Sequence, residues 1–145
     1  MPMIDVYAPE GTFPDPHALA QRLAATLMAI EQVPDIAMFR ENTACFVHVL
    51  PGAAISNVDG GTGVRVQVLT NAGALDRDKQ LAVVEQFTTI VADEASAAQA
   101  APRTWVLLTE ATPGGWGLWG HAHTNDELVA AARREIAALR GTASV

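Results

Sequence analysis

A proline in the second position is the first residue of this sequence whose type and place can do chemistry. Met1-Pro2 stands directly before an alternating apolar and polar stretch, residues 4–7, which is typical of a β-strand. A strand accepts proline at its first position because the ladder does not yet need that N–H. If Met1 is removed, Pro2 carries a free secondary amine; if Met1 is retained, that nitrogen is an amide and has no such role.

A free amine at this place has two possible chemical uses. The α-amino group titrates near about pH 8, and apolar surroundings lower its pKa because they disfavour the charged form. It can then act as a general base near neutral pH, moving a proton between carbon and oxygen. It can also form an imine with a carbonyl compound.

The length and composition of the chain exclude several classes of protein. A chain of 145 residues, half of them hydrophobic, predicts a single domain over residues 1–145 with a substantial core. A net charge of −7 with nine Lys and Arg residues argues against a nucleic-acid surface. No apolar run reaches the roughly 18 residues that span a bilayer, and a signal-peptide pattern is missing. We therefore expect a cytoplasmic protein with no membrane or nucleic-acid partner.

The first half of the chain reads as a β-α-β unit. A strand is expected over about 2–8, and Asp15-Pro16 supplies an N-cap and first-turn proline for a helix to about residue 32, which Pro34 stops. The apolar stripe of that helix is Leu19, Leu23, Leu27 and Ile30. An apolar run at 45–50, closed by Pro51, predicts a buried strand in which the single Cys45 is a small core residue.

The second half repeats this pattern about 62 residues later. It predicts a strand at 64–69, a helix from Asp76 to about Ala97 and a strand at 105–109, with one helix face formed by Leu81, Val84, Phe87 and Val91. The glycine-rich stretch at 57–63 is not a phosphate loop, because it lacks the following Lys-Ser/Thr and leads into a strand. The pseudo-repeats are therefore about 2–62 and 63–123, and a last helix covers about 125–140.

Two β-α-β repeats with right-handed crossovers define an α+β fold. They form a four-stranded sheet with two helices on one face. The other face of the sheet is left uncovered, and its apolar residues imply an oligomer. The glycine and tryptophan segment at 113–120 is expected to be a turn or short hairpin that reaches a neighbouring subunit.

Together these features resemble the tautomerase superfamily. The resemblance rests on the proline after Met1, the second copy about 60 residues on, and the strand end Thr109-Glu110 that leads into residues 115–118. It covers residues 2 to about 123, and the length is similar to two-repeat members such as malonate semialdehyde decarboxylase and cis-3-chloroacrylic acid dehalogenase. It implies a tautomerase-like (MIF-like) fold, a homotrimer, and a catalytic amino-terminal Pro2 that needs no cofactor.

The resemblance also assigns further residues. Trp116 falls where 4-oxalocrotonate tautomerase-like members place an aromatic ring against the proline, and only the first repeat carries the proline, since Val64 stands in the second. The family's arginine after the first strand's glycine is replaced by Thr12 and, in the second copy, by Ala74. A further arginine position of the family corresponds to Trp105. Arginine binds a carboxylate through two parallel hydrogen bonds, which other side chains do not reproduce. The missing arginines therefore argue against the acid substrates that are usual in the family.

Several residues are candidates to replace the missing arginines. Arg40, Arg65 and Arg103 are the available guanidinium groups, each also readable as a solvated or structural arginine. Asn71 can hydrogen-bond a carbonyl oxygen or simply shape a turn. The predicted substrate-binding set is Arg65, Asn71, Arg103, Trp105 and Trp116.

Four other side chains receive a structural interpretation. His121 and His123 lie on one side of an extended segment, but no carboxylate or cysteine partner is evident near them in the sequence, so no metal site is predicted. His48 is expected to be a hydrogen-bonded strand histidine. Glu110 is either an exposed strand-end carboxylate or an activator of water.

The sequence thus predicts a cofactor-independent tautomerase that acts on a small carbonyl compound, an oxo-acid or enol, with Pro2 as general base. Two alternatives stay open. One is hydration or decarboxylation of a small oxo-acid on the same scaffold, with a protonated Pro2 as the acid. The other is a non-catalytic protein that kept the scaffold and lost the arginines.

Overall fold

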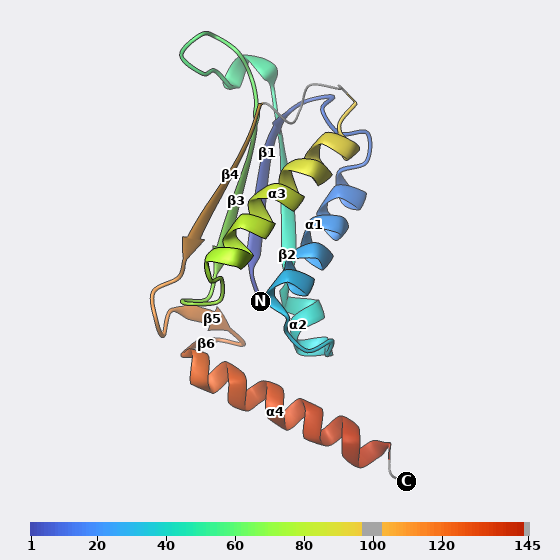
Figure 1. Ribbon diagram of the computed structural model, residues 1–145, viewed down its shortest axis with the longest axis vertical. Helices are drawn as coiled ribbons and strands as arrows, with labels where there is room; N and C mark the ends of the chain where they lie inside the picture. Colours follow the sequence, from blue (N-terminus) through green and yellow to red (C-terminus); the bar gives the residue numbers. More distant parts are fainter. Residues whose placement is uncertain (97–102, 144–145) are drawn as a thin grey trace.

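One mixed sheet organises the computed structural model, which describes residues 1–96 and 103–143 (Figure 1). Its strands are β1 (Met3–Pro9), β2 (Ala44–Leu50), β3 (Val64–Thr70) and β4 (Thr104–Glu110), in the order β2-β1-β3-β4. β1 runs parallel to β2, β3 runs parallel to β4, and β1 pairs with β3 antiparallel, with Val6 opposite Val66. The predicted α+β fold with two β-α-β repeats is confirmed.

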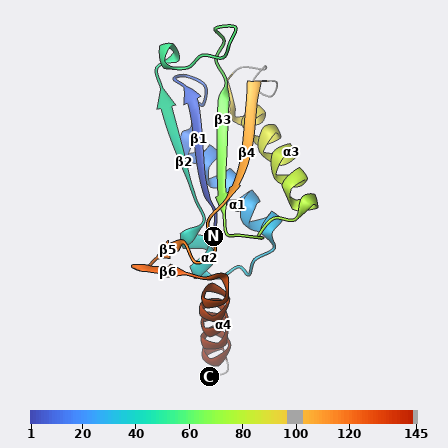
Figure 2. The same ribbon diagram turned by 90° about the vertical axis from the view of Figure 1, so that its left-hand side faces the viewer.

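Two long helices cover one face of this sheet (Figure 2). In α1 (Pro16–Glu31) the Asp15 side chain accepts a hydrogen bond from the Ala18 N–H, and Leu19, Leu23 and Leu27 are fully buried, as predicted. α1 ends at Glu31 because Gln32 takes a left-handed conformation with φ 60°. The sheet contributes alternate residues to the same core, among them Ile4, Val6, Val66 and Val68.

The second covering helix, α3 (Arg77–Glu94), corrects two details of the prediction. Its buried face is Val83, Phe87, Ile90 and Val91, whereas Leu81 and Val84 of the predicted face are exposed. Positions 83, 87, 90 and 91 follow the helical spacing i, i+4, i+7, i+8, so the true stripe is rotated from the predicted one. Ala95 is extended and ends α3 before the predicted Ala97, which lies outside the described residues.

The remaining elements lie at the two ends of the sheet. A short helix α2 (Ala37–Asn42), at the end where β1 begins, and a 3₁₀ turn η1 (Gly52–Ala54), at the opposite end directly after β2, were not predicted. The glycine and tryptophan segment forms a hairpin of β5 (Trp116–Leu118) and β6 (His121–His123), as expected. α4 (Asn125–Thr142) begins with a capping box between Thr124 and Glu127 and extends away from the body (Figures 1 and 2).

The second face of the sheet carries no helix of the same chain (Figure 2). Large apolar side chains stand on it with about half of their surface exposed: Phe46 54%, Trp105 46% and Leu107 48%. Among the described residues, no helix is long and apolar enough to cross a membrane. The expected uncovered apolar face is therefore present, and it is a surface suited to contact with another protein.

Candidate active site

The amino terminus lies buried at the end of the sheet where β1 begins (Figure 1). Met1 is 3% exposed and Pro2 is fully buried, and the Pro2 carbonyl accepts a hydrogen bond of 3.2 Å from the Ala44 N–H of the neighbouring strand. The terminal amine of Met1 lies 3.6 Å from Oε2 of Glu31, the last residue of α1. An amine and a carboxyl group thus face each other at the base of β1.

Glu31 occupies an unusual place for an acid. Its side chain is 3% exposed, and neither carboxyl oxygen has a hydrogen-bond partner among the described residues. It continues the buried stripe of Leu19, Leu23 and Leu27 at the next fourth residue, so the helix itself directs it inward. Lys79 donates a hydrogen bond of 3.1 Å to the backbone carbonyl of Glu31, leaving the carboxyl group to the amine.

Burial changes the acidity of both members of this pair. Desolvation raises the pKa of the Glu31 carboxyl group, and the nearby amine and Lys79 counteract it. Desolvation lowers the pKa of the terminal amine, and the electrostatic attraction of Glu31 counteracts that. Burial therefore favours the arrangement in which the amine is neutral and Glu31 holds the proton, which is the form an amine needs to act as a base.

A pocket of about 260 Å³ opens beside Met1 and Glu31. It is bounded by the end of α1, by α2, by the loop after β3 and by the start of α4. Its lining is mostly apolar and small, and contains no Lys, Arg or His: Met1, Glu31, Val33, Phe39, Asn71, Ala72, Gly73, Ala74, Asn125, Leu128 and Val129. The pair of ionisable groups thus faces a cavity of the size of a small molecule.

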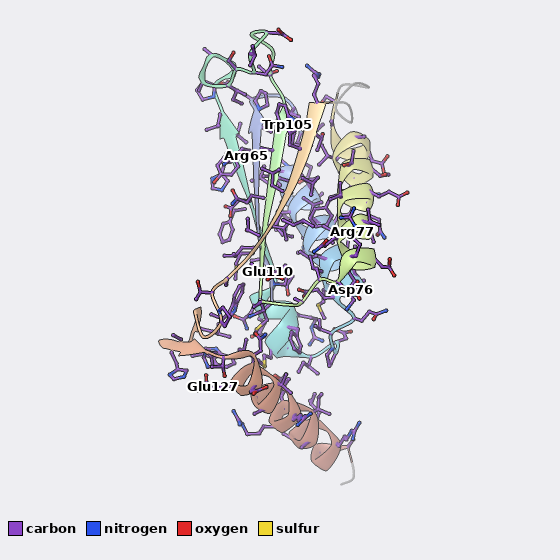
Figure 3. All side chains as sticks on the ribbon, turned by 60° about the vertical axis from the view of Figure 1, so that its left-hand side comes forward. Arg65, Asp76, Arg77, Trp105, Glu110 and Glu127 are labelled. Atoms are coloured by element: carbon purple, nitrogen blue, oxygen red, sulfur yellow. The ribbon has the colours of Figure 1, made fainter. Side chains whose placement is uncertain are left out.

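The loop after β3 forms a fixed wall of this pocket. The Glu110 carboxylate accepts a hydrogen bond of 3.0 Å from the Gly73 N–H, and the Asn125 amide donates one of 2.9 Å to the Ala72 carbonyl. Glu110 lies at the same end of the sheet as the pocket, and Arg65 and Trp105 lie at the other end (Figure 3). Glu110 therefore holds the loop that carries Asn71.

An apolar cluster closes the site behind Met1. It joins Met1 to α2, to the hairpin and to α4, and its buried members are Met1, Ile36, Met38, Trp116, Leu128 and Ala132. Trp116 is 7% exposed within it. The hairpin thus brings the indole ring into the same cluster as the residue that precedes Pro2.

The predicted binding residues divide between the two ends of the sheet. Asn71 lines the pocket and Trp116 belongs to the cluster around Met1. Arg65 and Trp105 stand opposite each other in the β3–β4 register near the start of these strands, where the Arg65 guanidinium lies 4.4 Å over the Tyr7 ring (Figure 3). Because β3 is antiparallel to β1, these residues are at the far end from Pro2 of the same chain.

A second pocket, of about 190 Å³, lies at that far end. It is lined by Thr12, Gly63, Val64, Ala95 and Arg103, among others. A shift of 62 residues places Val64 on Pro2 and Gly73 on Gly11, so the second pocket is the counterpart of the first in the second repeat. It has no terminal amine, because the chain continues through Gly63 into Val64.

The sequence interpretation missed Glu31, Phe39 and Leu128. Glu31 carried a detectable signal, since an acid that follows leucines at every fourth position stands on the buried face of the helix. Phe39 and Leu128 belong to α2 and α4, whose places beside the pocket depend on contacts between distant segments. No local pattern reports such contacts.

The remaining candidates have structural surroundings. His48 pairs with Asp5 at 2.6 Å and stacks on Tyr7, as expected of a hydrogen-bonded histidine. His121 lies 3.2 Å from Glu127, a carboxylate partner that the sequence interpretation did not foresee. Among the described residues no group of three His, Cys, Asp or Glu side chains is placed to hold a metal ion. Burial raises the pKa of the Cys45 thiol to about 12, so it is not a thiolate near neutral pH.

The mixed sheet of two β-α-β repeats, with both helices on one face, is the fold of solved structures of fused 4-OT, of a member of the cis-3-chloroacrylic acid dehalogenase family and of malonate semialdehyde decarboxylase. Solved structures with this fold include a fused 4-OT symmetric trimer, with 14% identity, a TM-score of 0.69, and coverage of 82% of this chain and 93% of that one. The Pt0534 protein inactivated by 2-oxo-3-pentynoate has 15% identity, a TM-score of 0.70, and coverage of 87% and 98%.

Malonate semialdehyde decarboxylase is similar as well, with 13% identity, a TM-score of 0.61, and coverage of 83% of this chain and 93% of that one. No protein-family model matches the sequence, and no curated protein matches it. The resemblance inferred from the sequence is thus confirmed as a shared fold that covers 82–87% of this chain in these structures.

Proposed function

We propose that this protein is a cofactor-independent tautomerase of the tautomerase superfamily that acts on a small carbonyl compound with Pro2 as its general base. The observation that carries the proposal is the buried terminal amine, held 3.6 Å from an otherwise unpartnered carboxyl group at the edge of a pocket. Such an arrangement favours a neutral amine at the start of β1, directly beside Pro2.

Removal of Met1 would complete the site in two ways. The free amine becomes that of Pro2, whose nitrogen is one residue step further along the chain and so within about 7 Å of Glu31 Oε2. The space that Met1 leaves joins the pocket that Met1 now lines, with Trp116 and Leu128 of the same cluster as its apolar walls. The substrate then occupies the place of the Met1 side chain.

The reaction needs one proton to change place twice. The neutral Pro2 amine takes a proton from the carbon next to the substrate carbonyl, and the C–H electron pair becomes the C=C bond of an enol or enolate. The same proton returns from the ammonium to oxygen or to another carbon. Asn71 donates a hydrogen bond to the carbonyl oxygen as negative charge develops there, while the apolar wall excludes water.

The test begins with the mature chain. Intact mass decides whether the protein starts at Pro2, and titration of that amine is expected to give a pKa below that of a free proline amine. Pro2→Ala keeps an amino-terminal amine and should lower enol-to-ketone turnover by about 10²–10⁴-fold, the usual contribution of a positioned base. A retained Met1, or full turnover in Pro2→Ala, would refute the proposal.

Assembly into a homotrimer through the open sheet face is part of this proposal. It is supported by the exposed Phe46, Trp105 and Leu107 on that face and by the fused 4-OT of the same fold, which forms a trimer. Leu107→Asp would bury a charge without a partner in such an interface, so it should yield monomers in sedimentation at micromolar concentration. Leu81→Asp, at a similarly exposed position on α3, should leave the assembly intact.

The pocket favours tautomerisation over the lyase alternative. Decarboxylation or hydration of an oxo-acid requires a group that holds the substrate carboxylate, and the lining residues include no cationic side chain. Glu110, the candidate activator of water, is engaged by the Gly73 N–H. Within one chain, Arg65, Arg103 and Trp105 are too far along the sheet to take part, and Asn71 and Trp116 are the predicted residues that the proposal keeps.

A further inference from the structure

We propose that the pocket beside Pro2 binds uncharged carbonyl compounds and that the Glu31 carboxyl group excludes carboxylates from it. The inference rests on the proposed function, because it concerns the substrate of the Pro2 amine. It names a chemical class, small ketones, aldehydes or their enols without an acidic group, and a residue that selects this class.

The pocket has one basic and one acidic ionisable group in its lining, the terminal amine and Glu31, and the Met1 amine lies 3.6 Å from Glu31 Oε2. After removal of Met1 the amine is that of Pro2, about 7 Å or less from the same oxygen. Whichever of the two holds the shared proton, the pair has no net charge. A substrate carboxylate would bring a negative charge into a buried space next to Glu31 without a cation to pair with it, which disfavours binding.

No cationic side chain among the described lining residues is available to a carboxylate. Lys79, in the first turn of α3, donates a hydrogen bond of 3.1 Å to the Glu31 backbone carbonyl and is not part of the pocket lining. The side-chain donors of the lining are the neutral amides of Asn71 and Asn125, and the Asn125 amide binds the Ala72 carbonyl. We assign Asn71 as the donor to one neutral substrate oxygen, which fits a ketone or aldehyde better than a carboxylate.

The fold does not require a buried acid at this place. The buried stripe Leu19, Leu23 and Leu27 of α1 corresponds to Val83, Phe87 and Val91 of α3, 64 residues later. The same shift places Ala95, a partly buried apolar residue packed against the core, where α1 has Glu31. The same place in the scaffold thus carries a small apolar side chain where no terminal amine exists, and a buried acid where one does.

The test uses two probes that differ in one group. The uncharged 3-pentyn-2-one and the acid 2-oxo-3-pentynoate share the same acetylenic ketone, with a methyl group in one replaced by a carboxylate in the other. The amine adds to the alkyne carbon distant from the carbonyl: an N–C bond forms, one π bond breaks, and the N–H proton moves to the carbon beside the carbonyl. Mass spectrometry follows the labelling rate of Pro2 at pH 7.5.

Each labelling rate is divided by that of a short peptide that begins with proline, which removes the intrinsic reactivity of the probes. We expect the corrected rate to be at least tenfold higher for the ketone than for the acid. Glu31→Gln should bring the two within about threefold by raising the rate of the acid. Glu31→Leu, which extends the leucine stripe, serves as a second variant. Asp93→Asn, the same acid-to-amide change at an exposed position near the end of α3, is the matched control and should keep the wild-type ratio.

The outcomes separate this inference from the proposed function. If neither probe labels Pro2, the proposed function fails and this inference fails with it. If Pro2 is labelled but the acid reacts as fast as the ketone, or if both Glu31 variants keep the wild-type ratio, only the selection by Glu31 is refuted. Loss of acid labelling in Lys79→Met would also refute it, because Lys79 would then be a carboxylate anchor.

Discussion

The two pockets lie at opposite ends of the sheet, one in each repeat. Among the described residues, only the first contains a chain terminus and a buried acid. In the first, the chain begins, and its buried amine meets the buried Glu31. In the second, the chain runs on through Gly63 into Val64, and Asp93 pairs with Arg22 on the surface. One end has an ionisable pair inside a cavity, and the other has its charges in solvent.

This difference shows how two repeats can share a fold while only one of them carries a buried ionisable pair. The helices, the strand pairing and the positions of the loops repeat, because they depend on the apolar pattern that both halves share. The ionisable pair depends on two features that are not shared, the chain terminus and an acid on the buried stripe of α1. A variant that transfers or removes either feature should therefore change one pocket and not the other.

The largest effect is expected from adding a cation to the first pocket. Ala74 lines it directly after Gly73, at the position where the superfamily resemblance places an arginine. Ala74→Arg should raise the labelling of Pro2 by 2-oxo-3-pentynoate by roughly 10–100-fold, because hydrogen bonds to charged groups contribute about 1.5–3 kcal/mol. The measurement is the ratio of acid to ketone labelling by mass spectrometry.

The second repeat supplies the matched control for this variant. Thr12 follows Gly11 in the second pocket as Ala74 follows Gly73 in the first. Thr12→Arg adds the same charge to the chain at the end without an amine, so it should leave the labelling ratio at its wild-type value. An equal gain in both variants would mean that long-range attraction of the acid, and not binding in the first pocket, is responsible.

A smaller effect, on stability, is expected from adding a methyl group at Gly63 in the second pocket. A Cβ atom at Gly63 would lie 2.5 Å from the Trp105 ring and 2.7 Å from the Arg103 carbonyl. Gly63→Ala should therefore lower the free energy of unfolding by about 1–3 kcal/mol, the usual effect of overpacking. Gly117→Ala, whose Cβ would meet nothing within 4 Å, should change it by less than about 0.5 kcal/mol. Urea unfolding monitored by tryptophan fluorescence compares the two.

Local patterns were enough to predict the framework of the molecule. Alternation marks β1, and the N-caps Asp15 and Asp76 begin the two covering helices where expected. Because crossovers between parallel strands are right-handed, the order of these elements allows only a few topologies for two β-α-β units. Pro2 was singled out by its place before β1, and Trp116 by the resemblance to the superfamily; Trp116 shares an apolar cluster with Met1.

The parts that were not predicted depend on contacts between segments far apart in the sequence. The helix α2 has no side-chain cap of its own, and the Met38 N–H donates instead to Glu135 of α4, 97 residues away, at 3.3 Å. Arg65 and Trp105 were named for their residue types, while their distance from Pro2 follows from the antiparallel pairing of β1 with β3. The pairing of Glu31 with the terminal amine follows only from the folded structure, which brings residues 1 and 31 together.

The smallest effect concerns the stability of the buried pair. Burial raises the pKa of the Glu31 carboxyl group in the folded state, so the folded chain holds this proton more tightly than the unfolded chain does. Glu31 therefore destabilises the fold progressively as pH rises from the unfolded-state value of about 4.5 through the raised folded value, and has little effect below that window. Glu31→Gln removes the titration. It should raise the free energy of unfolding at pH 9 by about 1–2 kcal/mol, in the lower part of the range for an unsatisfied buried group, since Lys79 offsets part of the charge.

The same variant should match the wild type within about 0.5 kcal/mol at pH 4, where Glu31 is protonated in the folded state and mostly protonated in the unfolded state. Asp93→Asn, an exposed acid near the end of α3, loses a surface ion pair and should cost less than about 1 kcal/mol. Urea unfolding of the three proteins across this pH range makes the comparison. A Glu31→Gln protein that is less stable than the wild type at pH 9 would show that the charged carboxylate is stabilised in the fold, and the contrast between the two ends of the sheet would then lie in the amine alone.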